Sequence, residues 1–135
     1  MSDEQQSTKQ VIVMRTDTVP AMRKGKMIAQ GAHAAMAFLT SRMQTESSML
    51  NFDVLDLSEE AMRWLGGDMT KICVRAESLR ELMDVYDKAK ELQVEAHIIE
   101  DKGYTEFSGP TKTCLAIGPD HPEKVDKITG HLKLL

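Results

Sequence analysis

Residues 24–35 read KGKMIAQGAHAA, an alanine-rich segment that predicts a helix over about residues 25–44. The polar residues Lys26, Gln30 and His33 are spaced i, i+4 and i+7, so they share one face of that helix. The small residues around them allow neighbouring elements to pack closely. The lysines at its start suit an anionic ligand, because a first helical turn exposes free N–H groups and a partial positive charge.

Short apolar runs predict strands that alternate with helices along the rest of the chain. The expected strands cover residues 10–16, 70–75, 94–99 and 113–118. Further helices are expected from the N-cap Ser58 to Gly66, from about 78 to 92 and from 123 to 129, and residues 45–57 are expected to be irregular. This alternation indicates an α/β sheet with helices on both faces. The direct return from the third strand to the fourth favours one antiparallel pair, so we expect a mixed sheet.

The composition indicates one domain of a soluble protein. The 135 residues suit one core over residues 10–135, with a disordered polar tail at residues 1–9. No apolar run approaches the roughly 20 residues of a membrane span, and no apolar signal core is present. Cys73 and Cys114 lie in apolar runs without metal-ligand spacing, so we expect buried free thiols and a cytoplasmic location. The net charge of −4 argues against bulk attraction to nucleic acid but allows a local basic patch.

A carboxylate and several cations are expected at one edge of the sheet. Asp101 follows the third strand and opens a polar loop, while the loop after the first strand leads to Lys26. If these strands are parallel, Asp101, Lys26 and nearby threonine hydroxyls converge beyond the strands' carboxyl ends. A lysine beside a carboxylate can activate water while neighbouring donors stabilise an oxyanion. In the alternative interpretation Asp101 only caps the loop, and Lys26 is a solvated residue of the first helical turn.

His33 also has two interpretations. It is a candidate catalytic base, because an unperturbed histidine titrates near neutral pH. In an alanine-rich helix a histidine is more often a packed residue that hydrogen-bonds a neighbouring element. The chain has no Walker-type phosphate loop, dinucleotide glycine pattern, zinc spacing or nucleophile elbow.

Several segments together carry a family resemblance. They are VIVMRTD (11–17), MRKGKMIAQGAHAA (22–35), Trp64 with the glycines after it, DKGYT (101–105), TCLAIGP (113–119) and ITGHLKLL (128–135). With these segments the chain resembles the type 2 peptidyl-tRNA hydrolase family over nearly everything from residue 10 to the end. The resemblance implies a single three-layer α/β/α domain with a four-stranded mixed sheet. It also implies a homodimer that works without a metal or organic cofactor.

The activity implied by the resemblance is hydrolysis of the ester between a peptide, or an N-blocked aminoacyl group, and the 3′ end of tRNA. The family's active-site positions map onto Lys26, Asp101, Thr105 and Thr113, and His33 matches the family histidine on the first helix. Nearby polar residues are candidates for binding peptidyl-tRNA, and these are Arg23, Lys24, Gln30, Lys102 and Lys112.

The loop that should meet the substrate departs from the family pattern. Where the family typically reads D-A-G-R-T-Q, residues 101–106 read DKGYTE, so Tyr104 replaces an arginine and Glu106 a glutamine. Loss of a guanidinium removes a bidentate phosphate partner that Lys102 does not reproduce. Two alternatives therefore stand beside the hydrolase: a non-catalytic binding protein on the same fold, and a hydrolase of a different acylated substrate.

Overall fold

The computed structural model describes residues 7–44 and 56–135, and the strands in these ranges form one mixed sheet. They are β1 (Lys9–Arg15), β2 (Lys71–Ala76), β3 (Ala96–Asp101) and β4 (Thr111–Asp120), in the spatial order β2-β1-β4-β3. β1 is parallel to β2 and antiparallel to β4, and β4 is antiparallel to β3. β1, β2 and β3 therefore run in one direction, and their carboxyl ends lie at the same edge. The expected mixed sheet is confirmed.

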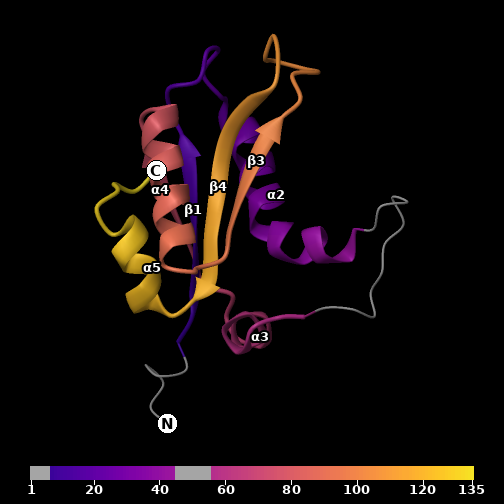
Figure 1. Ribbon diagram of the computed structural model, residues 1–135. Helices are drawn as coiled ribbons and strands as arrows, with labels where there is room; N and C mark the ends of the chain where they lie inside the picture. The colour runs from indigo at the N-terminus through magenta and orange to yellow at the C-terminus, as the bar shows by residue number, and fades with distance from the viewer. Residues whose placement is uncertain (1–6, 45–55) are drawn as a thin grey trace.

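Helices cover both faces of this sheet, as expected for an α/β/α domain. They are α2 (Lys24–Met43), α3 (Glu59–Gly66), α4 (Leu79–Glu91) and α5 (Pro122–Thr129). Figure 1 shows α4 and α5 on one side of the strands and α2 on the other, with α3 at the end of the sheet opposite the β3–β4 loop. In the part of the chain that the structure describes, no helix is long and apolar enough to cross a membrane.

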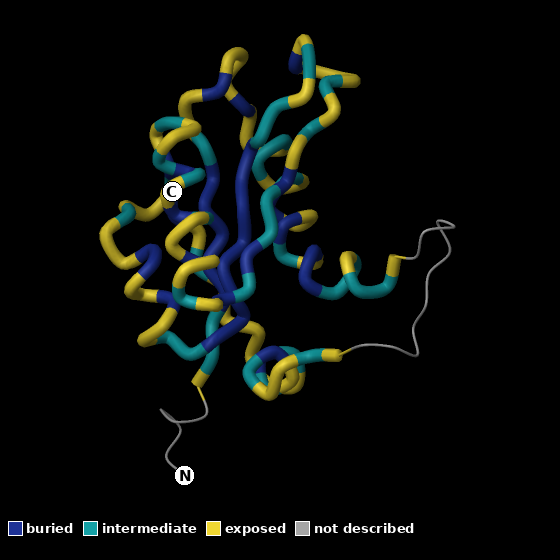
Figure 2. Tube along the Cα trace, in the orientation of Figure 1, coloured by how far each residue is buried: buried dark blue, intermediate teal, exposed yellow. Residues whose placement is uncertain are grey.

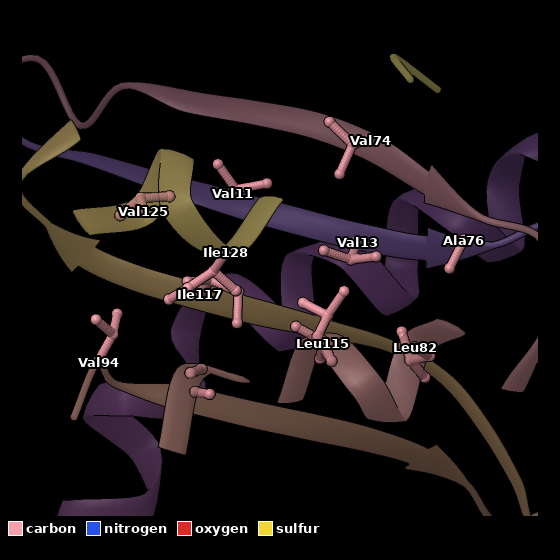
Figure 3. Packing of buried hydrophobic residues seen from close by; sticks show 13 residues of the cluster. Val11, Val13, Val74, Ala76, Leu82, Val94, Leu115, Ile117, Val125 and Ile128 are labelled. Carbon is pink, nitrogen blue, oxygen red and sulfur yellow. The ribbon is translucent and has the colours of Figure 1, made fainter. Parts of the chain in front are cut away.

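The two central strands are buried on both faces, which explains their continuous apolar sequences. Alternate residues of β1 and β4, such as Val13 and Leu115, pack against Leu82 of α4 on one face (Figure 3). The intervening residues, such as Met14, pack against Ala34 of α2 on the other face. The deepest burial accordingly follows β1 and β4 through the middle of the molecule (Figure 2).

Two serines cap the N-termini of helices in the same way. The Ser58 hydroxyl accepts a hydrogen bond from the N–H of Ala61 at 3.0 Å, and α3 begins at the next residue. The Ser78 hydroxyl accepts one from the N–H of Glu81 at 3.0 Å, at the start of α4. Each bond satisfies an N–H group that has no partner within its helix, so the serine fixes where the helix starts.

The strands of the β3–β4 hairpin extend two residues further toward their connecting loop than the hydrophobic pattern predicts. Asp101 was expected just past the third strand, but it is the last residue of β3 and pairs with Thr111 of β4. β4 accordingly begins two residues before the predicted start at Thr113. The reason is that ladder hydrogen bonds use backbone groups, so polar residues at a hairpin's open end extend the strands without an apolar signal.

The expected terminal tail, the expected irregular segment and the two cysteines differ in how far the structure matches the predictions. Residues 1–6 of the expected tail at 1–9 lie outside the described residues, but Lys9 was wrongly assigned to the tail because it is the first residue of β1. Residues 45–55 of the expected irregular segment at 45–57 also lie outside the described residues. Cys114 is a buried free thiol as expected, and burial raises its pKa to about 11. Cys73 was expected to be buried but is exposed. It lies on the edge strand β2, whose outer side pairs only with the short C-terminal segment, through an isolated bridge between Val74 and Leu134.

Candidate active site

Lys26, Asp101 and Thr105 form a hydrogen-bonded group at the carboxyl end of β3. The Lys26 ammonium donates to Asp101 Oδ1 at 2.7 Å and to Thr105 Oγ1 at 3.3 Å. The Lys26 and Asp101 side chains are only 14% and 13% exposed, whereas Thr105 is exposed. Two of the three ammonium donors are therefore used, and one remains to bind a substrate oxygen.

The topology explains how residues distant in sequence come together here. Asp101 ends β3, and Lys26 lies in the first turn of α2, which follows β1. Because β1 and β3 run in the same direction, the turn before α2 and the β3–β4 loop project from one end of the sheet (Figure 1). The convergence expected from the carboxyl ends of these strands is therefore observed.

The electrostatics of the group keep Asp101 ionised. The hydrogen bond from Lys26 lowers the pKa of the Asp101 carboxyl below its ordinary value, against the opposing effect of burial. The N–H of Gly103 also lowers it by donating to Asp101 Oδ2 at 2.9 Å. A carboxylate held in this way accepts hydrogen bonds with a fixed orientation, so it can position a water molecule.

Thr113 belongs to the same region but is fully buried, with 0% exposure. Its hydroxyl donates to Gln30 Oε1 at 2.5 Å, joining β4 to α2 one helical turn beyond Lys26. Thr113 therefore lies behind Gln30 and does not present its hydroxyl at the surface. Because its carbonyl oxygen accepts this bond, the Gln30 side chain has its two amide N–H donors directed elsewhere.

The site loop, residues 102–110, is anchored by features that the sequence interpretation missed. Phe107 is 4% exposed and packs in the core between α2 and the sheet, and the Lys26 ammonium lies 5.5 Å from the centroid of its ring. Gly103 has φ +84°, and a Cβ there would lie 2.7 Å from the backbone of Gly109. Phe107 is an apolar residue in an otherwise polar loop, which was the signal available in the sequence.

His33 shares a helix face with Lys26 but not its site. Seven residues of helix separate the two by about 10 Å along the axis. His33 is exposed, and within the described residues no hydrogen bond or ion pair joins it to Lys26, Asp101 or Thr105. The structure therefore brings the other four candidate catalytic residues into one region, with Thr113 behind Gln30, and leaves His33 outside.

The candidate binding cations divide into two kinds. Arg23, Lys24 and Lys102 are exposed, the first two at the start of α2 and the third in the site loop. Lys112 is partly buried and forms an ion pair with Glu100 at 3.2 Å, so its charge is partly compensated. The exposed cations lie next to Lys26 and Asp101 in sequence, on the start of α2 and on the site loop, which the Lys26–Asp101 contact brings together.

Three side chains of the types that can bind a metal ion lie together at the opposite end of β4. Glu60, Asp120 and His121 place ligand atoms within 4.8 Å of one another. Glu60 Oε1 lies 3.2 Å from His121 Nε2, and Asp120 Oδ1 accepts a hydrogen bond from the backbone N–H of His121 at 2.7 Å. These groups stand at the first turns of α3 and α5, where carboxylates offset the helix dipoles. The cluster is therefore separate from the Lys26–Asp101 group.

Comparison with known proteins places this fold and site in a family. The family model described as peptidyl-tRNA hydrolase PTH2 matches residues 8–135. The chain belongs to this family. Two archaeal relatives resemble the PTH2 chain over nearly its whole length. The peptidyl-tRNA hydrolase of Methanocaldococcus jannaschii is 41% identical, covering 94% of this chain and 99% of its own. That of Sulfurisphaera tokodaii is 43% identical, covering 96% and 99%.

The PTH2 fold also resembles a more distant solved structure. A protein of unknown function from Agrobacterium tumefaciens matches with a TM-score of 0.57 and 13% identity, over 95% of this chain and 97% of that one. At this level of identity the likeness concerns the fold alone. The function is therefore inferred from the more similar PTH2 relatives and from the geometry of Lys26 and Asp101.

Proposed function

We propose that this protein hydrolyses the ester that joins a peptide, or an N-blocked aminoacyl group, to the 3′ end of tRNA. Membership of the peptidyl-tRNA hydrolase PTH2 family supports this reaction. The single structural observation that carries the proposal is the Lys26–Asp101–Thr105 group, in which an ammonium and a carboxylate face each other beside an exposed hydroxyl. Ester hydrolysis needs an oriented water and a stabilised oxyanion, and this group can supply both.

In the proposed mechanism Asp101 positions the attacking water. Because Lys26 lowers the pKa of Asp101, the carboxylate stays ionised and accepts a hydrogen bond from the water. The water oxygen then bonds to the ester carbonyl carbon, and the negative charge that develops on the carbonyl oxygen is stabilised by the free donor of Lys26. The bond to the ribose oxygen breaks, and this oxygen takes up the proton that the water loses. The immediate products are a tRNA with a free 3′-end hydroxyl and a peptide carboxylic acid, which then releases its remaining proton to the solvent.

Gln30 and Thr113 have supporting roles in this proposal. Thr113 is a positioning residue, because its buried hydroxyl holds the Gln30 carbonyl oxygen at 2.5 Å. The Gln30 amide N–H groups are then directed away from the core and can donate to the substrate. Thr105 contacts the Lys26 ammonium at 3.3 Å and is exposed, so it can hydrogen-bond the ester or the ribose.

The tRNA backbone is proposed to follow the exposed cations. Arg23 and Lys24 precede Lys26 on α2, and Lys102 follows Asp101, so positive charge borders the reacting groups on both segments. Lysine and arginine contacts to phosphates release counterions and add sequence-independent affinity. The acidic net charge of −4 does not prevent this, because the contact is local.

The test of the proposed function is release of N-acetylaminoacyl groups from tRNA by the purified protein. We expect multiple turnovers with N-acetylaminoacyl-tRNA, and strong loss of turnover but retained RNA binding in Asp101→Asn. Binding of tRNA without turnover at high protein concentration would support the non-catalytic alternative. Hydrolysis of other acyl esters in a substrate panel, with none of the tRNA ester, would support a different acylated substrate.

We also propose that the protein is a homodimer joined through a groove between α2 and β2. The groove has a volume of about 290 Å³, and the side chains that line it include Met27, Ile28 and Leu135 beside the exposed Cys73. Ile28 is 72% exposed and Leu135 is 49% exposed, so apolar side chains stand at the surface here. A second copy related by a two-fold axis would cover this groove with the same apolar residues.

The oligomeric state in solution tests the homodimer. We expect light scattering to give a dimer for the parent protein and a monomer for Ile28→Glu, because the charge would be buried at the interface. Met62→Glu is the matched control, since Met62 is 54% exposed on α3 and should leave the dimer intact. A monomeric parent protein, or a dimer that survives Ile28→Glu, would overturn the proposal.

A cytoplasmic location is proposed as well. It is supported by the tRNA substrate of the proposed reaction and by the free thiols of Cys73 and Cys114, which suit a reducing compartment. Cell fractionation followed by detection of the protein would test it, and recovery in a membrane or secreted fraction would contradict it.

A further inference from the structure

Tyr104 is an exposed aromatic residue beside the proposed catalytic group. It is 86% exposed, and it is the only aromatic residue among the highly exposed large apolar side chains of residues 7–44 and 56–135. The residue after it, Thr105, receives a hydrogen bond from the Lys26 ammonium. The ring makes little contact with the core, so its face is free to contact a ligand.

Contacts on both sides of Tyr104 fix the loop segment that carries it. On one side, the N–H of Gly103 is bonded to Asp101, and Gly103 packs against the backbone of Gly109. On the other side, Phe107 is inserted into the core with 4% exposure. Both ends of the segment that carries Tyr104 are therefore anchored, so a ligand that meets the ring encounters a surface that is already positioned.

The chemistry of the substrate indicates what this ring would meet. In the proposed reaction the ester lies at Lys26 and Asp101, and its oxygen belongs to the ribose of the terminal nucleotide. The base of that nucleotide is attached to the same ribose, so it must lie within one nucleotide of the reacting carbon. Unpaired bases at the ends of RNA are characteristically recognised by stacking on aromatic side chains.

We propose that Tyr104 is the stacking platform for the base of the 3′-terminal nucleotide of tRNA. The inference rests on the proposed function, because that function places the terminal ribose at Lys26 and Asp101. It assigns separate tasks to neighbouring residues: Lys102 contributes charge toward phosphates, and Tyr104 contributes a neutral surface toward the base. The stacking contribution should therefore persist at salt concentrations that weaken the phosphate contacts.

The test is a binding cycle between the protein and the RNA. A fluorescently labelled acceptor-stem hairpin ending in CCA is compared with the same hairpin whose terminal nucleotide lacks its base. Fluorescence anisotropy gives the Kd of each RNA for the parent protein, Tyr104→Ala and Tyr104→Phe. We expect Tyr104→Ala to weaken binding of the intact RNA by about 5- to 150-fold, the equivalent of about 1–3 kcal/mol. Binding of the base-free RNA should change by less than about twofold, and Tyr104→Phe should bind both RNAs like the parent.

Three results would overturn the proposal. They are no loss of affinity in Tyr104→Ala, an equal loss for both RNAs, and no measurable binding of the intact RNA by the parent protein. Release of N-acetylaminoacyl groups from tRNA is measured in parallel, and it separates this inference from the proposed function. Turnover by the parent protein with no base-dependent effect of Tyr104 removes the stacking role alone. Base-dependent binding through Tyr104 without turnover removes the hydrolase alone.

Discussion

The Lys26 ammonium and the Asp101 carboxylate lie 2.7 Å apart, although 75 residues separate them in the chain. Their side chains are 14% and 13% exposed, so the pair is shielded but reaches solvent. At such a position the attraction between the two charges is stronger than at an open surface. Removing one of the two groups would leave the other charge shielded and unpaired. The pair also ties the first turn of α2 to the end of β3, which makes it both the chemical centre and a tertiary contact.

The Thr113–Gln30 contact should matter for catalysis without touching the substrate. We expect Thr113→Val, which keeps the shape but removes the hydroxyl, to reduce kcat/KM by about tenfold and stability by about 1–3 kcal/mol. The cause is that the Gln30 side chain loses the donor that fixes it. Steady-state kinetics and thermal unfolding measure the two effects.

Thr113→Ser is the matched control, because it keeps the donor in the same buried place. Its kinetics should stay within about twofold to threefold of the parent protein. Parent-like kcat/KM in folded Thr113→Val would show that Gln30 does not need this partner.

Gly103 should be sensitive to substitution and Gly109 should not. Gly103→Ala forces an L residue to φ +84° and places a Cβ 2.7 Å from the Gly109 backbone, so the loop must move. The left-handed conformation alone costs about 1–2 kcal/mol. We expect at least a tenfold loss of turnover, together with a lower Tm.

Gly109→Ala tests whether any change in this loop is harmful. An added Cβ at Gly109 has nothing within 4 Å, so turnover and stability should remain near those of the parent protein. Equal effects of the two substitutions would contradict the backbone argument.

Glu95 should make the stability depend on pH in the acidic range. Burial alone would raise the pKa of this carboxyl, but hydrogen bonds from His97 and Arg42 outweigh it and lower the pKa from 4.5 to about 2. Because the folded state holds the charged form, this stabilisation is complete above pH 4.5 and is lost as the pH falls toward 2. Glu95→Gln should therefore lower the free energy of unfolding by about 1–3 kcal/mol at pH 7.

Denaturant unfolding of both proteins between pH 7 and pH 2 measures this difference. It should shrink below pH 4.5 and nearly disappear at about pH 2. Glu91→Gln is the control, because its ion pair with Lys88 is long, at 3.8 Å, and exposed. Its effect should stay within about 0.5 kcal/mol at every pH. A constant difference for Glu95→Gln would contradict the assignment.

The exposed cations should control the salt dependence of tRNA binding. Removing one phosphate contact lowers the slope of log K against log salt by about 0.7–0.9. We expect this change for Lys24→Ala and for Lys102→Ala, and a smaller one for Lys112→Ala, because Lys112 is paired with Glu100. Binding titrations at several salt concentrations measure the slopes. Identical slopes for all three variants and the parent protein would show that the RNA takes another path.

Much of the architecture was predictable because strong local signals agreed with the tertiary structure. The apolar run of β1 reflects burial on both faces, and Ser58 and Ser78 begin helices through local hydrogen bonds. The approach of Lys26 to Asp101 followed from strand direction, because the carboxyl ends of parallel strands meet at one edge. The catalytic roles of these residues do not follow from the geometry and remain proposals.

Other features depend on distances and packing that periodicity does not encode. Helical spacing placed His33 on the face of Lys26, but a shared face extends along the axis, and two turns put His33 outside the group. Thr113 follows polar residues in the sequence, yet the β3–β4 ladder and Gln30 bury it completely. Cys73 lies in an apolar run and is exposed, because burial of an edge strand depends on what covers it.

The most direct test of the central claim is a double-mutant cycle on Lys26 and Asp101, with turnover of N-acetylaminoacyl-tRNA as the readout. If the two side chains act as one catalytic group, Lys26→Met and Asp101→Asn should each lower kcat by about 10²–10³. The double variant should lose little more than either single variant, because groups that act together are not additive. Parent-like kcat in either single variant, with the fold intact, would contradict the account.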